Sequence, residues 1–350
     1  MSKKRTAVAA FLATAVLSLT QYAYAATPPV TTSPTFSLDF SDSSKVSGST
    51  WTDQVASLSA AAVGTQFSPE LGGIETFTAS ASYLDFGKPA IGSALNPTND
   101  LSGEVWIKFT TLNQYWNIFL THWFDDLAGN GTASDFHFGV YTDGVRTRTL
   151  NLYTTNKADL YGTTAIVTNK WYHFVFTIDN SSATKREAIY VNNNLEASYT
   201  SASSLRVANT SNKFIVGDAR AATGPNGVLA KVRLYSRALT ATEVQSNFFA
   251  ERAAFGYQAQ VNLSAANGLY RTSQTLTATS SQAGKATFYA NNKVIPGCMK
   301  KAITTTVTCS WKPAIHGFNN VRVAVTPTDA QYADGSAQST IFIVKRTNNR

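Results

Sequence analysis

The sequence predicts an all-β protein made of two sandwich domains, and three observations support this. Thr, Ser, Tyr, Val and Phe form short alternating runs separated by Gly and Asn, which is typical of strands joined by turns. Convincing helical spacing is found in one segment, after Thr240. Charge also divides the chain: residues 26–256 contain 16 Lys and Arg against 19 Asp and Glu, whereas residues 257–350 contain 10 against 2. The basic character therefore belongs to the C-terminal part.

The first 25 residues are typical of a secretory signal peptide. Residues 3–5 are basic, an apolar run of about 14 residues follows, and small residues surround Tyr24. This run is shorter than the roughly 20 residues needed to span a bilayer, which argues against a membrane anchor. We therefore predict cleavage after Ala25, a Pro/Thr-rich linker over residues 26–35, and a protein that is secreted or associated with the cell surface. No later stretch is apolar enough to predict a transmembrane anchor.

Residues 36–256 predict a two-sheet sandwich of the jelly-roll type, because strand patterns recur with turn residues between them. The expected strands lie at 36–40, 105–109, 116–123, 136–140, 172–178, 188–191, 214–216 and 227–235. The last of these has one apolar side and one polar or aromatic side, which are Val228, Ala230, Val232 and Leu234 against Lys231, Arg233 and Tyr235.

A short helix is predicted directly after this closing strand. Thr240 and Glu243 have the spacing of a capping box, in which each side chain bonds the backbone of the other residue. Behind them, Val244, Phe248 and Phe249 recur at helical spacing. The helix is therefore expected to dock against the sandwich through these three residues.

Four segments of this domain resemble the laminin-G-like, or concanavalin A-like, jelly-roll family. They are residues 235–240, the Trp-Tyr-His at 171–173, residues 189–193 and residues 215–217. The resemblance covers residues 36–255 and implies a fold that serves lectins, adhesins, accessory domains of enzymes and enzymes alike. Asn193 replaces a turn glycine, which asparagine tolerates. Ala230 and Lys231 replace an acidic pair found in many members, so any role of that pair in binding is not carried over.

Residues 257–350 predict a second sandwich of six or seven short strands. Its segments at 285–298, 308–313 and 344–346 resemble bacterial immunoglobulin-like repeats. Cys298 and Cys309 lie 11 positions apart. In an oxidising compartment this spacing predicts one disulfide that joins neighbouring strands of a hairpin. The excess of Lys and Arg predicts attraction to anionic cell-envelope polymers, with a solvated basic surface that has no dedicated partner as the alternative. We expect no nucleic-acid partner, since no nucleic-acid motif accompanies the charge.

Catalytic patterns are missing from the sequence. No Asp or Glu has another acidic residue two positions away, so the paired carboxylates of the ExDxxE glycosidases are lacking. The histidines accompany neither a GxSxG elbow nor a cysteine nucleophile. We therefore expect a protein that is not an enzyme. The alternative is a polysaccharide-cleaving glycosidase or lyase whose carboxylates converge from separate strands.

One oxygen-rich segment, residues 121–141, predicts a binding site. Its acidic and amide side chains suit Ca²⁺ and sugar hydroxyls, and its aromatic rings suit the apolar face of a sugar. Strand alternation places Asp135, His137, Gly139 and Tyr141 on one face. The candidate ligand-binding residues are Trp123, Asp125, Asp126, Asn130, Asp135, His137 and Tyr141, and the candidate Ca²⁺ ligands are Asp125, Asp126, Asn130 and Asp135. The alternative is a solvated hairpin loop in which the Asp residues start turns.

A second polar stretch, residues 217–227, supplies the secondary candidates Asp218, Arg220 and Asn226. Taken together, the sequence predicts a non-catalytic exported protein whose first domain binds a glycan or a surface protein. Its second domain would then be a basic spacer or tether. The alternatives are the polysaccharide-cleaving enzyme and a purely structural surface or assembly protein.

Overall fold

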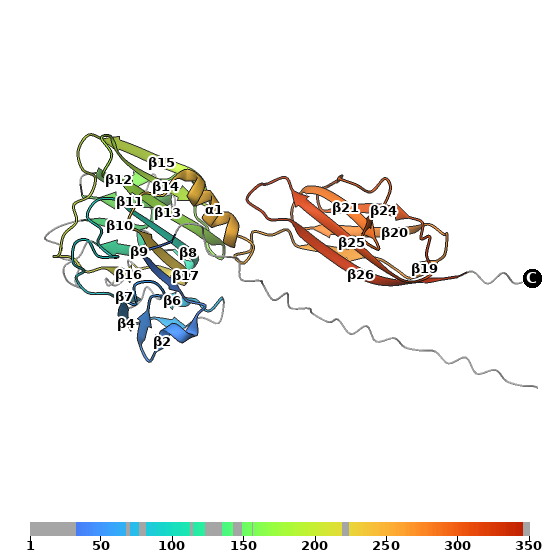
Figure 1. The fold of residues 1–350 in the computed structure, drawn as a ribbon, viewed down its shortest axis with the longest axis horizontal. Coiled ribbons are helices and arrows are strands. Elements are labelled where there is room, and N and C mark those ends of the chain that lie inside the picture. The colour runs from blue at the N-terminus through green and yellow to red at the C-terminus, as the bar shows by residue number, and fades with distance from the viewer. Residues whose placement is uncertain are drawn as a thin grey trace, which may run out of the picture.

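The computed structural model describes residues 33–67, 71–76, 82–112, 115–122, 135–142, 149–155, 157–218 and 224–345 (Figure 1). Within these residues nearly all regular structure is strand, apart from helix α1 (Ala241–Glu251) and the 3₁₀ turn η1 (Ser43–Lys45). The all-β prediction is thus confirmed. The predicted signal peptide and most of the linker lie outside the described residues. No helix of the described residues has the length and apolar character to cross a membrane.

Two sheets form the N-terminal sandwich. Sheet A has eight strands within the described residues, in the order β15-β14-β13-β8-β17-β6-β5 with β1 also paired to β17. Its strands are β1 (Phe36–Asp39), β5 (Gln66–Phe67), β6 (Ile74–Thr76), β8 (Leu101–Thr111), β13 (Trp171–Asp179), β14 (Lys185–Val191), β15 (Asn194–Ser201) and β17 (Asn226–Tyr235).

Sheet B packs against sheet A and has nine strands in the described part of the chain, in the order β12-β11-β10-β9-β16-β7-β4-β3-β2. Its strands are β2 (Val46–Ser47), β3 (Thr50–Thr52), β4 (Ser59–Val63), β7 (Ser82–Asp85), β9 (Trp116–His122), β10 (Phe136–Tyr141), β11 (Thr149–Thr154), β12 (Lys157–Tyr161) and β16 (Ile215–Asp218). Neighbouring strands in both sheets are antiparallel and are often distant in sequence, as in a jelly roll.

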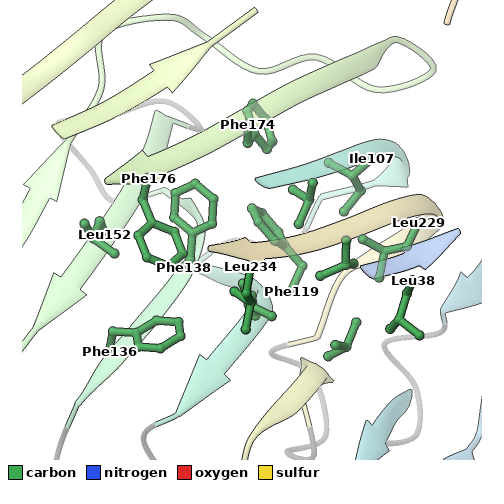
Figure 2. Packing of buried hydrophobic residues seen from close by; sticks show 14 of the residues in the cluster. Leu38, Ile107, Phe119, Phe136, Phe138, Leu152, Phe174, Phe176, Leu229 and Leu234 are labelled. Atoms are coloured by element: carbon green, nitrogen blue, oxygen red, sulfur yellow. The ribbon is translucent and has the colours of Figure 1, made fainter. Parts of the chain in front are cut away.

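The core lies between sheets A and B and is rich in phenylalanine (Figure 2). Phe174 of sheet A stacks on Phe119 of sheet B with ring centroids 5.7 Å apart, and Phe176 meets Phe138 edge-to-face at 5.0 Å. Such pairs add about 0.5–1.5 kcal/mol each beyond the burial of their area. The alternating pattern of the sequence fits this arrangement in strands such as β10 and β13, where every second residue enters the core.

The predicted sidedness of the closing strand β17 is wrong in part. Val232 and Leu234 enter the core as expected, but Val228 and Ala230 pack on the outer face of sheet A, beneath α1. A β-bulge between Leu229 and Lys231 is the reason, since one extra residue in a strand reverses the alternation on either side of it.

Helix α1 covers part of the outer face of sheet A. Its capping box is confirmed, because Thr240 Oγ1 accepts from the backbone N–H of Glu243, whose side chain accepts from the backbone N–H of Thr240. Val244 and Phe248 are fully buried, as predicted. Phe249 is 39% exposed and does not join the buried face.

A second sandwich follows, with a three-stranded sheet C (β18-β20-β24) and a six-stranded sheet D (β19-β26-β25-β21-β22, with β23 paired to β21), counted within the described residues. Their bounds are β18 (Val261–Ser264), β19 (Gly268–Leu269), β20 (Gln274–Ser280), β21 (Gly284–Ala290), β22 (Lys293–Val294), β23 (Lys301–Ile303), β24 (Thr306–Trp311), β25 (Gly317–Pro327) and β26 (Gly335–Val344). The immunoglobulin-like character of this sandwich and the domain boundary at residue 256 stay predictions.

The predicted disulfide between Cys298 and Cys309 is present, with a Cα–Cα distance of 5.6 Å. It does not staple a hairpin, however. Cys309 lies on β24 of sheet C, and Cys298 lies in the loop after β22, which hydrogen-bonds Phe288 of sheet D. The bond therefore links the two sides of the second sandwich through its core.

The two sandwiches meet at a buried tyrosine. Tyr257 packs with Trp106 and Phe255 on the outer face of sheet A, and its hydroxyl donates to the carbonyl of Trp171 at 2.7 Å. The same residue contacts Tyr332 of the second sandwich, with ring centroids 5.5 Å apart. Tyr257 thus makes side-chain contacts with both sandwiches.

Candidate functional site

The outer face of sheet B, along strands β9 to β12, carries a cluster of aromatic side chains. On β10, Phe136, Phe138 and Val140 enter the core, so His137 and Tyr141 point outward. In the register of the sheet, Tyr141 lies opposite Trp116 of β9, and His137 lies opposite Tyr153 of β11. Tyr161 of β12 lies opposite Asn151, which in turn lies opposite Gly139. Four adjacent strands therefore contribute to one surface.

These side chains form one continuous series of ring contacts. The ring centroids of Tyr153 and His137 are 5.0 Å apart, those of His137 and Trp116 are 4.9 Å apart, and those of Trp116 and Tyr141 are 4.3 Å apart. Tyr141 and Tyr161 continue the series at 5.6 Å. We call Trp116, His137, Tyr141, Tyr153 and Tyr161 the aromatic face. His137 is nearly buried, whereas the other four are half-buried and keep part of each ring accessible.

Gly139 lies in the middle of the aromatic face. A Cβ at this position would come within 2.7 Å of the carbonyl oxygen of Asn117, so the chain requires glycine here. The neighbouring position on β11 is Asn151, whose Nδ2 donates to Asp159 Oδ1 at 3.0 Å. Asp159 is partly exposed. The aromatic face thus combines accessible rings, a central position on β10 that has no side chain because it is Gly139, and the carboxylate of Asp159 at its edge.

Asp135, expected on the same face, has a different environment. Its carboxylate is fully buried, accepts from Arg206 Nε at 2.8 Å and lies 2.9 Å from His122 Nδ1. Burial alone would raise the pKa of Asp135, but the hydrogen bond with His122 and the charge of Arg206 together hold it below its ordinary value. Arg206 also donates to the carbonyl of Pro97. This carboxylate ties a loop to the end of sheet B and is engaged within the protein.

The other candidates from the sequence are dispersed. Trp123, Asp125, Asp126, Asn130 and Arg220 lie outside the described residues. Asp218 is buried at the end of β16, and Asn226 lies at the start of β17, where its Oδ1 accepts from Thr110 Oγ1 at 2.9 Å. The structure therefore brings together His137 and Tyr141, and adds Trp116, Tyr153 and Tyr161, which the sequence analysis did not single out.

A signal for one of the added residues, Tyr153, is present in the sequence. Residues 149–161 read TLNLYTTNKADLY, in which Tyr153 has the opposite parity to Leu150 and Leu152. An outward aromatic on a half-buried strand is an exception to the rule that the exposed side is polar.

Three of the four predicted Ca²⁺ ligands are not described, so the Ca²⁺ site stays a prediction. Among the described residues no group of three or more His, Cys, Asp or Glu is arranged to hold a metal ion.

Two glutamates on β14 and β15 have structural partners. Glu187 is fully buried and accepts from Thr154 Oγ1 at 2.9 Å. Glu196 accepts from the backbone N–H groups and the hydroxyls of Thr163 and Thr164, at 2.6–2.9 Å. These bonds hold the pKa of Glu196 below its ordinary value although partial burial opposes them. A carboxylate engaged in this way is poorly suited to be a general acid, which must keep its proton near neutral pH.

Comparison with known proteins agrees with this architecture. A family model described as the concanavalin A-like lectin/glucanases superfamily matches residues 79–245. The matched residues contain all four strands of the aromatic face and end within α1. The N-terminal sandwich therefore carries a match to a concanavalin A-like domain, and the second sandwich lies beyond it.

Solved structures with low sequence identity also align. A sialidase from Trypanosoma rangeli is 15% identical with a TM-score of 0.44, and the match covers 63% of this chain but 33% of the sialidase. Domain 4 of an extracellular arabinanase from Geobacillus stearothermophilus, in complex with arabinotriose, is 16% identical with a TM-score of 0.44, covering 61% of this chain and 97% of that domain. A pentraxin from Limulus polyphemus is 16% identical with a TM-score of 0.32, covering 42% and 69%. No curated protein matches the chain.

Proposed function

We propose that the protein binds carbohydrate without cleaving it, through the aromatic face of sheet B. The observation that carries this proposal is the aromatic face, with four half-exposed rings in contact around the nearly buried His137, beside the carboxylate of Asp159. A sugar ring has an apolar C–H face that packs on aromatic rings, and hydroxyl groups that need a few well-placed polar partners. The match of residues 79–245 to the concanavalin A-like superfamily model supports the same ligand class.

The rings are arranged to hold an extended ligand. Trp116 and Tyr141 lie on adjacent strands, and Tyr161 lies two strands further across the sheet. The ring centroids of Trp116 and Tyr141 are 4.3 Å apart and those of Tyr141 and Tyr161 are 5.6 Å apart, so the row from β9 to β12 extends over up to about 10 Å. This span corresponds to more than one sugar unit, and we infer an oligosaccharide or polysaccharide chain as the ligand. Export by the predicted signal peptide would place the protein where such polymers occur.

A glycan array probed with the full chain tests the proposal. We expect selective binding that falls about tenfold or more in Trp116→Ala, because one well-packed aromatic anchor contributes at least about 1.4 kcal/mol. Tyr199→Ala is the matched control, since Tyr199 is a 39% exposed aromatic on β15 of sheet A. Equal binding by wild type and Trp116→Ala would contradict the proposed site.

Two further readouts separate the alternatives. Loss of binding in a chelator and in Asp125→Ala/Asp126→Ala would support the predicted Ca²⁺ site. Release of reducing ends from a bound polysaccharide would support the enzyme in place of the non-catalytic binder. If no glycan binds and the purified protein polymerises, the structural alternative is favoured.

A further inference from the structure

The second sandwich has a cluster of exposed apolar side chains at one end. Phe318 on β25 is 77% exposed and lies opposite Phe342 on β26, with the two ring centroids 5.1 Å apart. Val344 on β26 pairs with Leu269 on β19, and both are exposed, as is Ile315 in the turn before β25. We call these five residues the apolar tip. It lies at the β19 end of the sandwich, away from α1 and the first sandwich (Figure 1).

Hydrogen bonds hold the backbone of the apolar tip in place. The N–H of Phe342 donates to Asn267 Oδ1 at 2.7 Å, and the N–H of Tyr270 donates to the carbonyl of Val344 at 2.9 Å. The N–H of Arg271 donates to the carbonyl of Pro313 at 3.0 Å, which joins the turn before β25 to the turn after β19. The exposed rings are therefore attached to backbone segments that hydrogen bonds hold in fixed positions.

Charge is distributed unevenly along this sandwich. Lys345 follows Val344 at the apolar tip, and the bond between Arg271 and Pro313 brings Arg271 and Lys312 to the same end. Both acidic residues of residues 257–350, Asp329 and Asp334, lie at the opposite end, next to the junction. There Gln258 Nε2 donates to the carbonyl of Asp334 at 3.0 Å, and Tyr332 donates to that of Asp329 at 3.1 Å. The apolar tip thus has Arg271, Lys312 and Lys345 at its own end and is remote from Asp329 and Asp334.

We propose that the apolar tip docks on the surface of an anionic lipid bilayer. Phe318 and Phe342 would enter the boundary between headgroups and acyl chains, while Lys312, Lys345 and Arg271 would meet the anionic headgroups. Apolar side chains bordered by Lys and Arg are the combination that binds such surfaces. Two copies of this chain meeting through their tips would bring like charges together, which disfavours a homodimer. A soluble polyanion would engage the cations and leave the phenylalanines in water.

This inference goes beyond carbohydrate binding and places a second contact at the far end of the molecule. A vesicle sedimentation assay with the full chain tests it, with phosphatidylglycerol and phosphatidylcholine in about a 3:7 ratio against phosphatidylcholine alone. We expect sedimentation with the anionic vesicles and reduced binding in roughly 0.5 M salt. Phe318→Ser/Phe342→Ser should lower the partition coefficient about tenfold or more, because the variant lacks the two rings that would be buried in the bilayer.

Control variants show whether vesicle binding depends on the apolar tip. Leu195→Ser/Tyr199→Ser removes two exposed apolar side chains from β15 and should leave vesicle binding unchanged. Trp116→Ala, which tests the aromatic face, should also leave it unchanged. Lys312→Glu/Lys345→Glu should weaken binding to anionic vesicles about 25-fold or more, at roughly fivefold for each lysine charge removed.

Three outcomes would overturn the proposal. The first is that the wild type does not sediment with vesicles, and the second is that Phe318→Ser/Phe342→Ser binds vesicles as well as the wild type does. The third is that the wild type and this double variant bind an anionic polysaccharide equally and neither binds vesicles. The last outcome would assign the basic end to a polymer. Thermal unfolding shows whether the double variant folds; if it does not, the single variant Phe318→Ser, at a side chain that is mostly in solvent, replaces it and the same outcomes apply.

Discussion

The two outer faces of the N-terminal sandwich are built from similar residue types but have different environments. On sheet A, Trp106 stacks on Phe255 at 4.0 Å and packs beside Phe248 of α1, so its ring is fully buried. On sheet B, Trp116 and Tyr141 contact each other at 4.3 Å and remain partly exposed. Rings covered by a helix stabilise the fold, whereas rings left at the surface are available to a ligand. The presence of α1 therefore decides which face of the sandwich is structural.

Charges follow the same division. Beneath α1, Arg233 donates to both Glu104 and Glu251, and Glu104 also accepts from Asn247 and Tyr235. Burial would raise the pKa of Glu104, but Arg233 and its other partners hold it far below its ordinary value. On the aromatic face, Asp159 has Asn151 as its partner and is partly exposed. One network is closed within the protein, and the other carboxylate keeps access to solvent.

Lys231 shows what replaces the acidic pair that many members of the resembled family have at this position. Its ammonium lies 2.9 Å from Glu251 of α1 and 3.0 Å from Asp39 of β1. Here the strand β17 supplies the cation, Lys231, and the carboxylates come from Glu251 of α1 and Asp39 of β1. These ion pairs connect β1, β17 and α1.

The largest expected effect comes from breaking the closed network. Arg233→Ala leaves Glu104 buried without its arginine and leaves Glu251 with Lys231 as its remaining cation, which should lower the free energy of unfolding by about 3–5 kcal/mol. Denaturant titration followed by tryptophan fluorescence measures this change. Arg237→Ala is the matched control, because Arg237 pairs with Glu243 at the surface and its loss should cost under about 1 kcal/mol. Equal effects of the two variants would contradict the claim that the ion-pair network beneath α1 is closed within the protein.

A smaller effect is expected from acid. The folded-state pKa values of Glu104, Glu251 and Asp39 are held below their ordinary values, where burial is outweighed by Arg233 for both glutamates and by Lys231 for Asp39. Their contribution to stability is therefore complete above about pH 4.3, the unfolded pKa of Glu, and is lost as the pH falls towards the folded values.

Unfolding midpoints at pH 7, 4 and 3 measure this loss, with the pH values chosen around the ordinary Glu pKa of about 4.3. We expect little change between neutral pH and about pH 5 and a decline below it. In Glu104→Gln the decline should be smaller, because one of the depressed groups no longer titrates. A decline of the same size in wild type and Glu104→Gln would assign the acid sensitivity to other carboxylates.

The smallest expected effect concerns the open face. Asp159→Asn keeps the shape and suits the backbone, since residue 159 has φ 40°, a region that asparagine tolerates. It removes one charged hydrogen-bond acceptor, so glycan affinity should fall by up to about tenfold while the unfolding free energy changes by under about 1 kcal/mol. Isothermal titration with an array-selected oligosaccharide measures the affinity. Asp179→Asn, a partly exposed carboxylate on sheet A that accepts from Ser182, should leave affinity unchanged.

Much of the local structure could be predicted from the sequence. The alternation of residues 172–178 predicts β13, and the spacing of Thr240 and Glu243 predicts the start of α1. These features depend on neighbours within a few positions, which the sequence displays directly. The disulfide between Cys298 and Cys309 was predictable because the chain has no other cysteine, but which strands it joins was not.

The candidate site depends on contacts between residues that are far apart in the sequence. Asp135 could be assigned to the face of His137 by alternation, yet its carboxylate turns to Arg206, a residue 71 positions away. The bulge after Leu229 likewise moved Val228 and Ala230 to the opposite side of the sheet. Neither partner nor bulge leaves a periodic signal, because each depends on which strands become neighbours.

By itself, therefore, the sequence determined the strand-rich composition, the capped helix, the paired cysteines and the change of charge near residue 256. The tertiary structure decided that Trp116, Tyr141 and Tyr161, which come from three strands, share one surface, and that α1 closes the other. The physical reason is that strand identity follows from side chains at successive positions, whereas a binding face is made by side chains that meet across strands. That meeting is fixed by pairing and register, which only the folded sheet contains.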